Sequence, residues 1–294
     1  MCINVSMLFY FLQLESVLMR LRNLSGLEIE ESIQHILAYG YCVIRNYVKD
    51  DKQVLLQQKA VELHSKLARQ GVKPASAVGI QKIIDKDRMV NNVILYDDNY
   101  LEIATTGDHL KIYSHFLNDP FYGLIPSDDA NFILGQANLR EGTTPLPFHV
   151  DTRMVIEGSA TWSMQAVIAL SRKKNINGGL RVRPGSHLLG EYPDSSIDYQ
   201  DAIDVDLDTG DIAIFSSQLH HGTHSTSKEQ KAGWSFNLTY RAWWTKQQFD
   251  FCSMLGKQKL ATLDNNQQLL LGACSIPPSE PTASPSMRQG YDRL

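Results

Sequence analysis

The chain has 294 residues, of which 43% are hydrophobic and 9% aromatic, so it can bury a sizeable core. Its formal net charge of -4 at pH 7 gives no overall attraction to nucleic acid or to an anionic membrane. The 4 cysteines form no CxxC pair and no spacing typical of a disulfide framework, so we expect a reducing compartment, the cytoplasm.

The two ends of the chain differ from the rest in composition. The apolar stretch 7–14 is shorter than the roughly 20 residues that cross a membrane, and no Lys or Arg precedes it as in a signal peptide. It fits a packed helix or an upstream start codon ahead of Met19. Residues 275–294 are rich in Pro and Ser, so we expect a flexible tail there.

Helical patterns dominate the first part of the chain. Ser25 and Glu28 have the spacing of a capping box ahead of apolar residues at helical spacing, and Gly40 stands at the C-cap position. We expect helices over about 26–39, 50–70 and from about 107, and a short strand over 41–48.

From about residue 131 the pattern changes to short β-rich runs separated by Gly, Pro, Asp and Asn. Many short strands predict a double-stranded β-helix, that is, a jelly-roll or cupin-like barrel. The predicted fold class is α+β and mainly β, with N-terminal helices packed outside the barrel. We expect one domain over 1–274, with a helical part over about 1–130 and the barrel core over about 131–250.

The segment PFHVD carries the first candidate site residues, His149 and Asp151. In an extended segment, alternation places both side chains on one face of a sheet and Val150 on the other. With one distant His they would form the two-His, one-carboxylate triad of non-haem Fe(II) oxygenases. An HxD tripeptide alone also fits a surface turn. The candidates for the third ligand are His220, His221 and His224 in QLHHGTHS.

Further motifs follow in order along the chain. The run NGGLRVRPGSH (177–187) and the segment TGDIAIFSSQLHHG (209–222) accompany the HxD pattern. In this combination the chain resembles the phytanoyl-CoA dioxygenase (PhyH-like) family of Fe(II)/2-oxoglutarate-dependent oxygenases, over about 130–245. The matching residues are His149, Asp151, Asn177, Gly178, Pro184 to His187, Gly210, Asp211, Phe215, His221, Gly222 and Thr223.

The resemblance implies a catalytic metal triad. His149, Asp151 and His221 would bind Fe(II), and 2-oxoglutarate and O2 would be the cosubstrates. His221 has the family's spacing from the Gly-Asp turn and precedes a Gly, while the neighbouring His220 is the alternative. His224 is expected to line the mouth of the barrel or to face solvent. Asp151 argues against a halogenase, since halogenating relatives carry a small residue in its place.

The cosubstrate anchor is where the chain departs from the family pattern. The family binds the far carboxylate of 2-oxoglutarate with an Arg after the distal His, because the guanidinium fork matches a carboxylate. Here position 232 is Ala, and the nearest cation is Lys231, with Arg241 as the second choice. Each has another interpretation, a solvated loop residue for Lys231 and a structural ion pair for Arg241. Thr223 resembles the hydroxyl residue that assists at this carboxylate.

Other polar residues complete the predicted site. Gln136 and Asn138 lie two apart in GQANLR, so one strand face presents two amides. In the family this strand contacts the cosubstrate, although ordinary strand-edge hydrogen bonds would also explain the pattern. The expected substrate-binding residues are Arg153, Gln165 and His224.

The implied reaction is hydroxylation of an unactivated C–H bond of a small molecule, coupled to decarboxylation of 2-oxoglutarate to succinate and CO2. We expect a natural-product (secondary-metabolite) hydroxylase, with an acyl-CoA or osmolyte hydroxylase as alternatives. Epoxidation and desaturation use the same site and stay open. A cupin-type binding protein without catalysis is a further alternative, because a fold does not fix a function. We expect a small-molecule substrate, no nucleic-acid or membrane partner, and leave the oligomeric state open.

Overall fold

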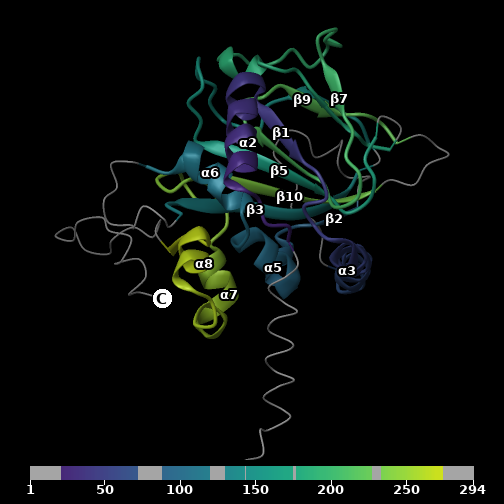
Figure 1. Ribbon diagram of the computed structural model, residues 1–294. Coiled ribbons are helices and arrows are strands. Elements are labelled where there is room, and N and C mark those ends of the chain that lie inside the picture. Colours follow the sequence, from purple (N-terminus) through teal and green to yellow (C-terminus); the bar gives the residue numbers. More distant parts are fainter. Residues whose placement is uncertain are drawn as a thin grey trace, which may run out of the picture.

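Two antiparallel sheets face each other and enclose the centre of the protein (Figure 1). The computed structural model describes residues 21–71, 88–119, 130–142, 144–174, 177–226 and 233–273. The larger sheet has six strands in the order β1-β8-β5-β10-β3-β2, and the smaller sheet has four in the order β4-β9-β6-β7. Along the chain, β3 to β6 and again β7 to β10 alternate between the two sheets. This is the topology of a jelly roll and confirms the predicted barrel.

The strands are short, as the sequence predicts. The larger sheet consists of β1 (Tyr41–Ile44), β8 (Ile212–Ser216), β5 (Ser163–Ala169), β10 (Trp234–Ala242), β3 (Phe132–Glu141) and β2 (Arg88–Val90). The smaller sheet consists of β4 (Leu146–His149), β9 (His221–Thr223), β6 (Leu180–Val182) and β7 (Ile203–Val205).

Helices cover the outer face of the larger sheet (Figure 1). The α-helices are α2 (Gly26–Tyr39), α3 (Asp50–Arg69), α5 (Asp98–Thr105), α6 (His109–Leu117), α7 (Phe251–Leu260) and α8 (Asn265–Leu270), and the 3-10 helices are η1 (Val93–Leu95) and η2 (Ser186–Leu188). In α2, Ser25 and Glu28 form the predicted capping box, and Gly40 adopts the left-handed conformation that ends the helix.

One expectation about the elements is wrong, and two helices were not expected. β1 ends at Ile44 rather than at residue 48, because the chain turns at Asn46, whose φ is 48°. Helices also follow the barrel as α7 and α8, which the sequence analysis did not predict. Gly256 inside α7 has φ 77°, so the helical period breaks there, and α8 is only 6 residues long. The stretch 7–14 and the tail 275–294 lie outside the described residues.

Alternation along the strands of the larger sheet separates an apolar face from a polar one. On β10, Phe236, Leu238 and Tyr240 belong to the buried core that the helices cover. Ser235, Asn237 and the other alternate residues point between the two sheets. A smaller apolar cluster lies between the sheets and includes Leu180, Val182, Leu207, Phe215 and Leu219. The space left beside this cluster is where a ligand fits.

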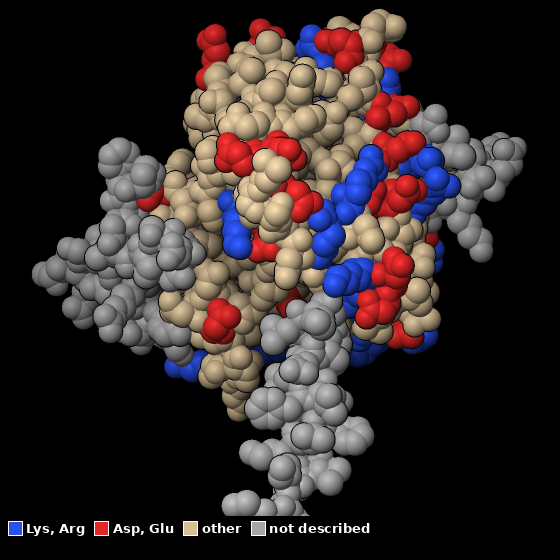
Figure 2. Space-filling view, in the orientation of Figure 1, with Lys and Arg blue, Asp and Glu red and all other residues tan. Residues whose placement is uncertain are grey.

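Within the described part of the chain, none of the helices combines the length and the apolar character needed to span a bilayer. Basic and acidic side chains lie intermixed on the face shown in Figure 2, in line with the small net charge.

A buried histidine makes folding sensitive to acid. His109 is fully buried, with Nδ1 2.8 Å from the hydroxyl of Tyr47 and Nε2 3.4 Å from the hydroxyl of Tyr240. Burial lowers the pKa of His109 from 6.5 to about 3. His109 therefore takes up a proton near pH 6.5 in the unfolded chain but only near pH 3 in the folded protein. The free energy of unfolding falls as the pH drops from about 6.5 to about 3.

We expect His109→Gln to flatten this part of the pH dependence, because the amide keeps hydrogen-bonding capacity without titrating. Urea unfolding at pH 7.5 and pH 5 measures the effect. Between these values the wild type should lose about 2 kcal/mol more of its free energy of unfolding than the variant does. Equal losses in the two proteins would show that His109 is not the group responsible.

Candidate metal centre

The pairing of β4 with β9 brings two of the three candidate ligands together. His149 and His221 are directly opposite each other in the register of these strands. Asp151 follows β4, and its backbone N–H donates to the carbonyl oxygen of Ser217 at 2.8 Å. Nε2 of His149 and Nε2 of His221 each lie 3.5 Å from one oxygen of the Asp151 carboxylate.

Both imidazole rings are oriented by backbone carbonyl groups. Nδ1 of His149 lies 2.9 Å from the carbonyl oxygen of Pro147, and Nδ1 of His221 lies 3.0 Å from that of Leu219. A carbonyl oxygen only accepts hydrogen bonds, so each Nδ1 carries a proton, and in the neutral ring Nε2 is the nitrogen that can offer a lone pair to a metal. Both lone pairs belong to the nitrogens that face Asp151, which is the arrangement that a metal site requires.

The electrostatics also suit a cation. Burial, and then the neighbouring His221, lower the pKa of His149, which favours its neutral form. Burial acts to raise the pKa of Asp151, but the two histidines outweigh it and hold that pKa far below its usual range. The carboxylate in turn raises the pKa of His221 against the effect of burial. The candidate ligand atoms lie within 4.8 Å of one another, so these residues could hold one metal ion.

The two neighbouring histidines point elsewhere. Nε2 of His220 lies 2.9 Å from the carbonyl oxygen of Glu191, on the other side of the chain from His221. Nε2 of His224 lies 2.6 Å from a carboxylate oxygen of Asp204 and is not among the residues that line the cavity. The structure therefore brings His221, and neither of its neighbours, to the HxD pair.

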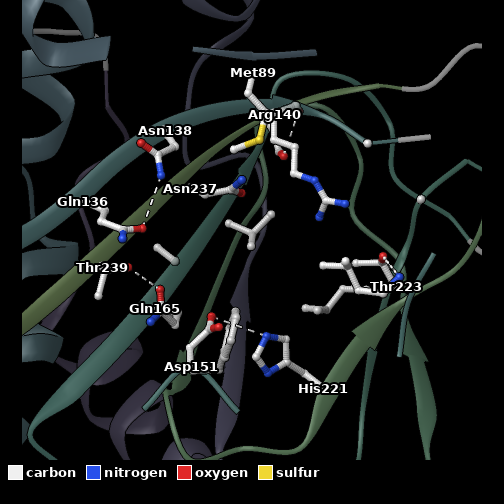
Figure 3. Close-up of a pocket in the computed structure, with 18 of the residues that line it drawn as sticks. Met89, Gln136, Asn138, Arg140, Asp151, Gln165, His221, Thr223, Asn237 and Thr239 are labelled. Atoms are coloured by element: carbon white, nitrogen blue, oxygen red, sulfur yellow. Dashed lines mark hydrogen bonds and ion pairs between the residues drawn. The ribbon is translucent and has the colours of Figure 1, made fainter. Parts of the chain in front are cut away.

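A cavity of about 340 Å³ lies between the two sheets next to these residues (Figure 3). One wall is the polar inner face of the larger sheet. It presents Gln136, Asn138 and Arg140 from β3, Gln165 from β5, and Ser235, Asn237, Thr239 and Arg241 from β10.

Hydrogen bonds fix several of these side chains. The hydroxyl of Thr239 donates to Oε1 of Gln165 at 2.6 Å, and Nε2 of Gln165 donates to Oγ of Ser217 at 2.9 Å. Nδ2 of Asn138 donates to Oε1 of Gln136 at 3.3 Å (Figure 3). The wall is therefore an ordered polar surface rather than a loose set of side chains.

The predicted cosubstrate and substrate residues take different positions. Gln136, Asn138, Gln165, Thr223 and Arg241 all line the cavity. Arg153 is exposed and does not line it. Lys231, the first choice for the cosubstrate anchor, lies outside the described residues, as does position 232.

Several lining residues were missed by the sequence analysis. Arg140 continues the alternation of Gln136 and Asn138 on β3, so the same pattern could have selected it. Asn237 and Thr239 alternate with large apolar and aromatic residues on β10. That run was interpreted as core, so its polar residues were not selected. Lys173 follows β5 in a segment of three consecutive basic residues, and nothing in the sequence distinguishes it from its neighbours.

The fold is a double-stranded β-helix, and its site brings together two His and one carboxylate, the ligand set typical of non-haem Fe(II) oxygenases. Residues 37–232 match the family model of phytanoyl-CoA dioxygenase (PhyH), which is more than half of the chain. The chain belongs to this family. The resemblance inferred from its motifs is thereby confirmed.

Solved structures share the fold at low sequence identity. The epimerase SnoN, in complex with Fe3+, alpha ketoglutarate and nogalamycin RO, is 14% identical over 79% of this chain and 91% of its own, with a TM-score of 0.58. The carbocyclase SnoK from nogalamycin biosynthesis is 15% identical over 83% of this chain and 92% of its own, with a TM-score of 0.56.

Curated relatives include two uncharacterized mycobacterial proteins, Rv1501 of Mycobacterium tuberculosis and Mb1539 of Mycobacterium bovis. Each is 29% identical over 127 residues, which is 42% of this chain and 45% of the relative. The match thus spans less than half the length of these relatives.

We expect divalent metal to stabilise the wild type through this triad. At a free Mn(II) concentration of about 100 times the dissociation constant, binding adds about 2.7 kcal/mol to the free energy of unfolding. Asp151→Ala and His221→Ala should lose this gain, and His220→Gln, the matched control on the adjacent residue, should keep it. Thermal unfolding with and without Mn(II) measures the effect. A gain retained in His221→Ala and lost in His220→Gln would assign the ligand to His220.

Proposed function

We propose that the protein is an Fe(II)/2-oxoglutarate-dependent dioxygenase that hydroxylates an unactivated C–H bond of a small molecule and converts 2-oxoglutarate to succinate and CO2. The observation that carries the proposal is the convergence of two histidines and one carboxylate at the wall of a cavity lined by both polar and apolar side chains, in a chain of the phytanoyl-CoA dioxygenase family. We place this activity in the cytoplasm, given the buried free thiols of Cys42 and Cys252.

The triad fits the metal that the family implies. His149, Asp151 and His221 would hold Fe(II), and such a triad leaves coordination positions for 2-oxoglutarate and O2. When bound, the iron supplies the activation of O2. The chain's own part is to present two Nε2 lone pairs and one ionised carboxylate, and to order the polar wall beside them. Asp151 also provides the carboxylate that halogenating relatives lack.

The cavity supports a small polar substrate. Its wall on the larger sheet includes amide, hydroxyl and guanidinium groups, to which a polar ligand can hydrogen-bond and an acyl chain cannot. We therefore favour a natural-product tailoring enzyme over an acyl-CoA hydroxylase, and an osmolyte hydroxylase is the second candidate because its substrates are also small and polar. SnoK and SnoN, two neighbours in fold, come from nogalamycin biosynthesis.

We expect the Fe(II)-loaded protein to form a visible charge-transfer band with 2-oxoglutarate under anaerobic conditions, and to release succinate when O2 is added. Asp151→Ala should lower succinate formation by more than about 100-fold, because even outer partners of metal ligands are worth about 10- to 100-fold. His224→Gln, outside the cavity, is the control. Absence of both the band and succinate in the wild type would exclude the oxygenase function.

The mass of the product tests hydroxylation itself. A screen of succinate release against a metabolite library identifies a substrate, and mass spectrometry then compares product with substrate. We expect a gain of one oxygen atom. A product of unchanged mass would indicate epimerisation, and a loss of two hydrogen atoms would indicate ring closure or desaturation, either of which contradicts the hydroxylase assignment.

A further inference from the structure

Two cations that the sequence analysis did not select line one part of the cavity. Arg140 extends from the inner face of β3, and Lys173 comes from the segment that follows β5. Figure 3 shows the guanidinium of Arg140 projecting into the cavity on the side of Thr223, across the cavity from Asp151. Arg140 therefore lies on the side of the cavity opposite Asp151, and Lys173 lines the same cavity.

A glycine lies beside each of these two side chains. A Cβ added at Gly142 would lie 3.2 Å from Cζ of Arg140, tighter than most real contacts. Gly178 has φ 80°, and a Cβ there would lie 3.9 Å from Nζ of Lys173. Both glycines line the cavity, so side chains at these positions would occupy space beside the cationic groups.

Lys173 packs against Gly233, the residue just before β10. A Cβ added at Gly233 would lie 2.8 Å from Cβ of Ser171 and 3.6 Å from Cε of Lys173. Lys173 is 5% exposed, and its ammonium group donates to the carbonyl oxygen of Gly233. A buried cation from a different segment thus already occupies the space beside this part of β10.

The balance of charge along the cavity favours an anionic ligand. Among the described lining residues, Arg140, Lys173 and Arg241 are cationic, and Asp151 is the sole carboxylate. A divalent metal ion at the triad would increase the positive excess. The binding of an anion stabilises cations that are partly buried. A 2-oxo dicarboxylate carries two negative charges and is such an anion.

The position of Arg241 separates it from the other two cations. Arg140 pairs with Ser235 across β3 and β10, and Arg241 lies six residues further along β10. At the rise of an extended strand, this is about 20 Å from the level of Arg140. The guanidinium of Arg241 packs over Gly135, where an added Cβ would lie 2.9 Å from Nε.

We propose that Arg140, with Lys173 beside it, binds the far carboxylate of 2-oxoglutarate, in place of the Arg that the family carries after its distal His. The inference rests on the proposed function. The fork of the guanidinium matches the two oxygens of a carboxylate, and the same group also donates to the carbonyl oxygen of Thr144 at 3.5 Å. Thr223 accepts the backbone N–H of Leu146 through Oγ1, so its own O–H can donate to the same carboxylate.

The test compares two ligands that differ only in the far group. 2-Oxopentanoate has a methyl group where 2-oxoglutarate has its second carboxylate, and both chelate metal through the same 2-oxo acid end. The full-length protein loaded with Fe(II) is titrated anaerobically with each acid, and the charge-transfer band and tryptophan fluorescence report the dissociation constants. The ratio of the two constants measures recognition of the far carboxylate, separately from turnover.

The wild type should prefer 2-oxoglutarate by about 10- to 100-fold, the usual value of a hydrogen-bonded charge. Arg140→Met should remove this preference and leave the affinity for 2-oxopentanoate unchanged, which also shows that the variant is folded. Arg140→Lys should retain part of the preference, and Lys173→Met should reduce it less than Arg140→Met does. Arg241→Met, and Arg172→Met at the exposed residue next to Lys173, should keep it.

Three results would overturn the inference. The preference could persist in both Arg140→Met and Arg140→Lys, it could disappear in Arg241→Met instead, or the wild type could bind the two acids equally. In each case the Fe(II) site and the proposed function would stand. If the wild type binds neither acid, the proposed function fails as well, so the two failures are distinguishable.

Discussion

The register between β4 and β9 is the constraint on which the site depends. It sets His149 directly opposite His221, and two residues later it leaves Asp151 between the two imidazoles. A shift of one residue would turn His221 to the far side of the sheet and bring His220 inward, because side chains alternate along a strand. The interactions of His220 with Glu191 and Ser186 on that far side oppose such a shift.

The larger sheet serves two purposes through its two faces. Its outer face forms most of the apolar core with the helices, and this burial provides the main stabilisation of the fold. On β3 and β10 the inner face carries amides, hydroxyls and guanidinium groups that suit a polar ligand, whereas Phe215 of β8 joins the apolar cluster between the sheets. On β10 the residues of the main core and the residues that line the cavity thus lie on opposite faces of the same strand.

Strong local signals were sufficient to predict most of the fold. The capping box of Ser25 and Glu28, Gly40, and the short β-rich runs all correspond to observed elements, because each depends on neighbours in the sequence. Helices α7 and α8 were missed because Gly256 interrupts the first and the second is short. Such elements form mainly through tertiary contacts, which a local pattern does not report.

The candidate site was predictable to the extent that it depends on motifs. His149, Asp151 and His221 could be selected from the sequence because the family motif names them, and the structure brings them together. Arg140 could have been found by extending the alternation of Gln136 and Asn138 by one more step. The place of Lys173 beside Gly233 follows from packing between distant segments, and no spacing along the chain indicates it.

The strand β4, which carries the first metal-ligand candidate, forms an edge of the smaller sheet. Two of the three ligands lie on or just after this edge strand, and residues 150–162 continue from it to β5 without a strand or helix of their own. Insertions and substitutions are tolerated more easily in such connections than in central strands. Relatives can therefore reshape the approach to the metal while the ligands stay in place, and one set of ligands can serve many substrates.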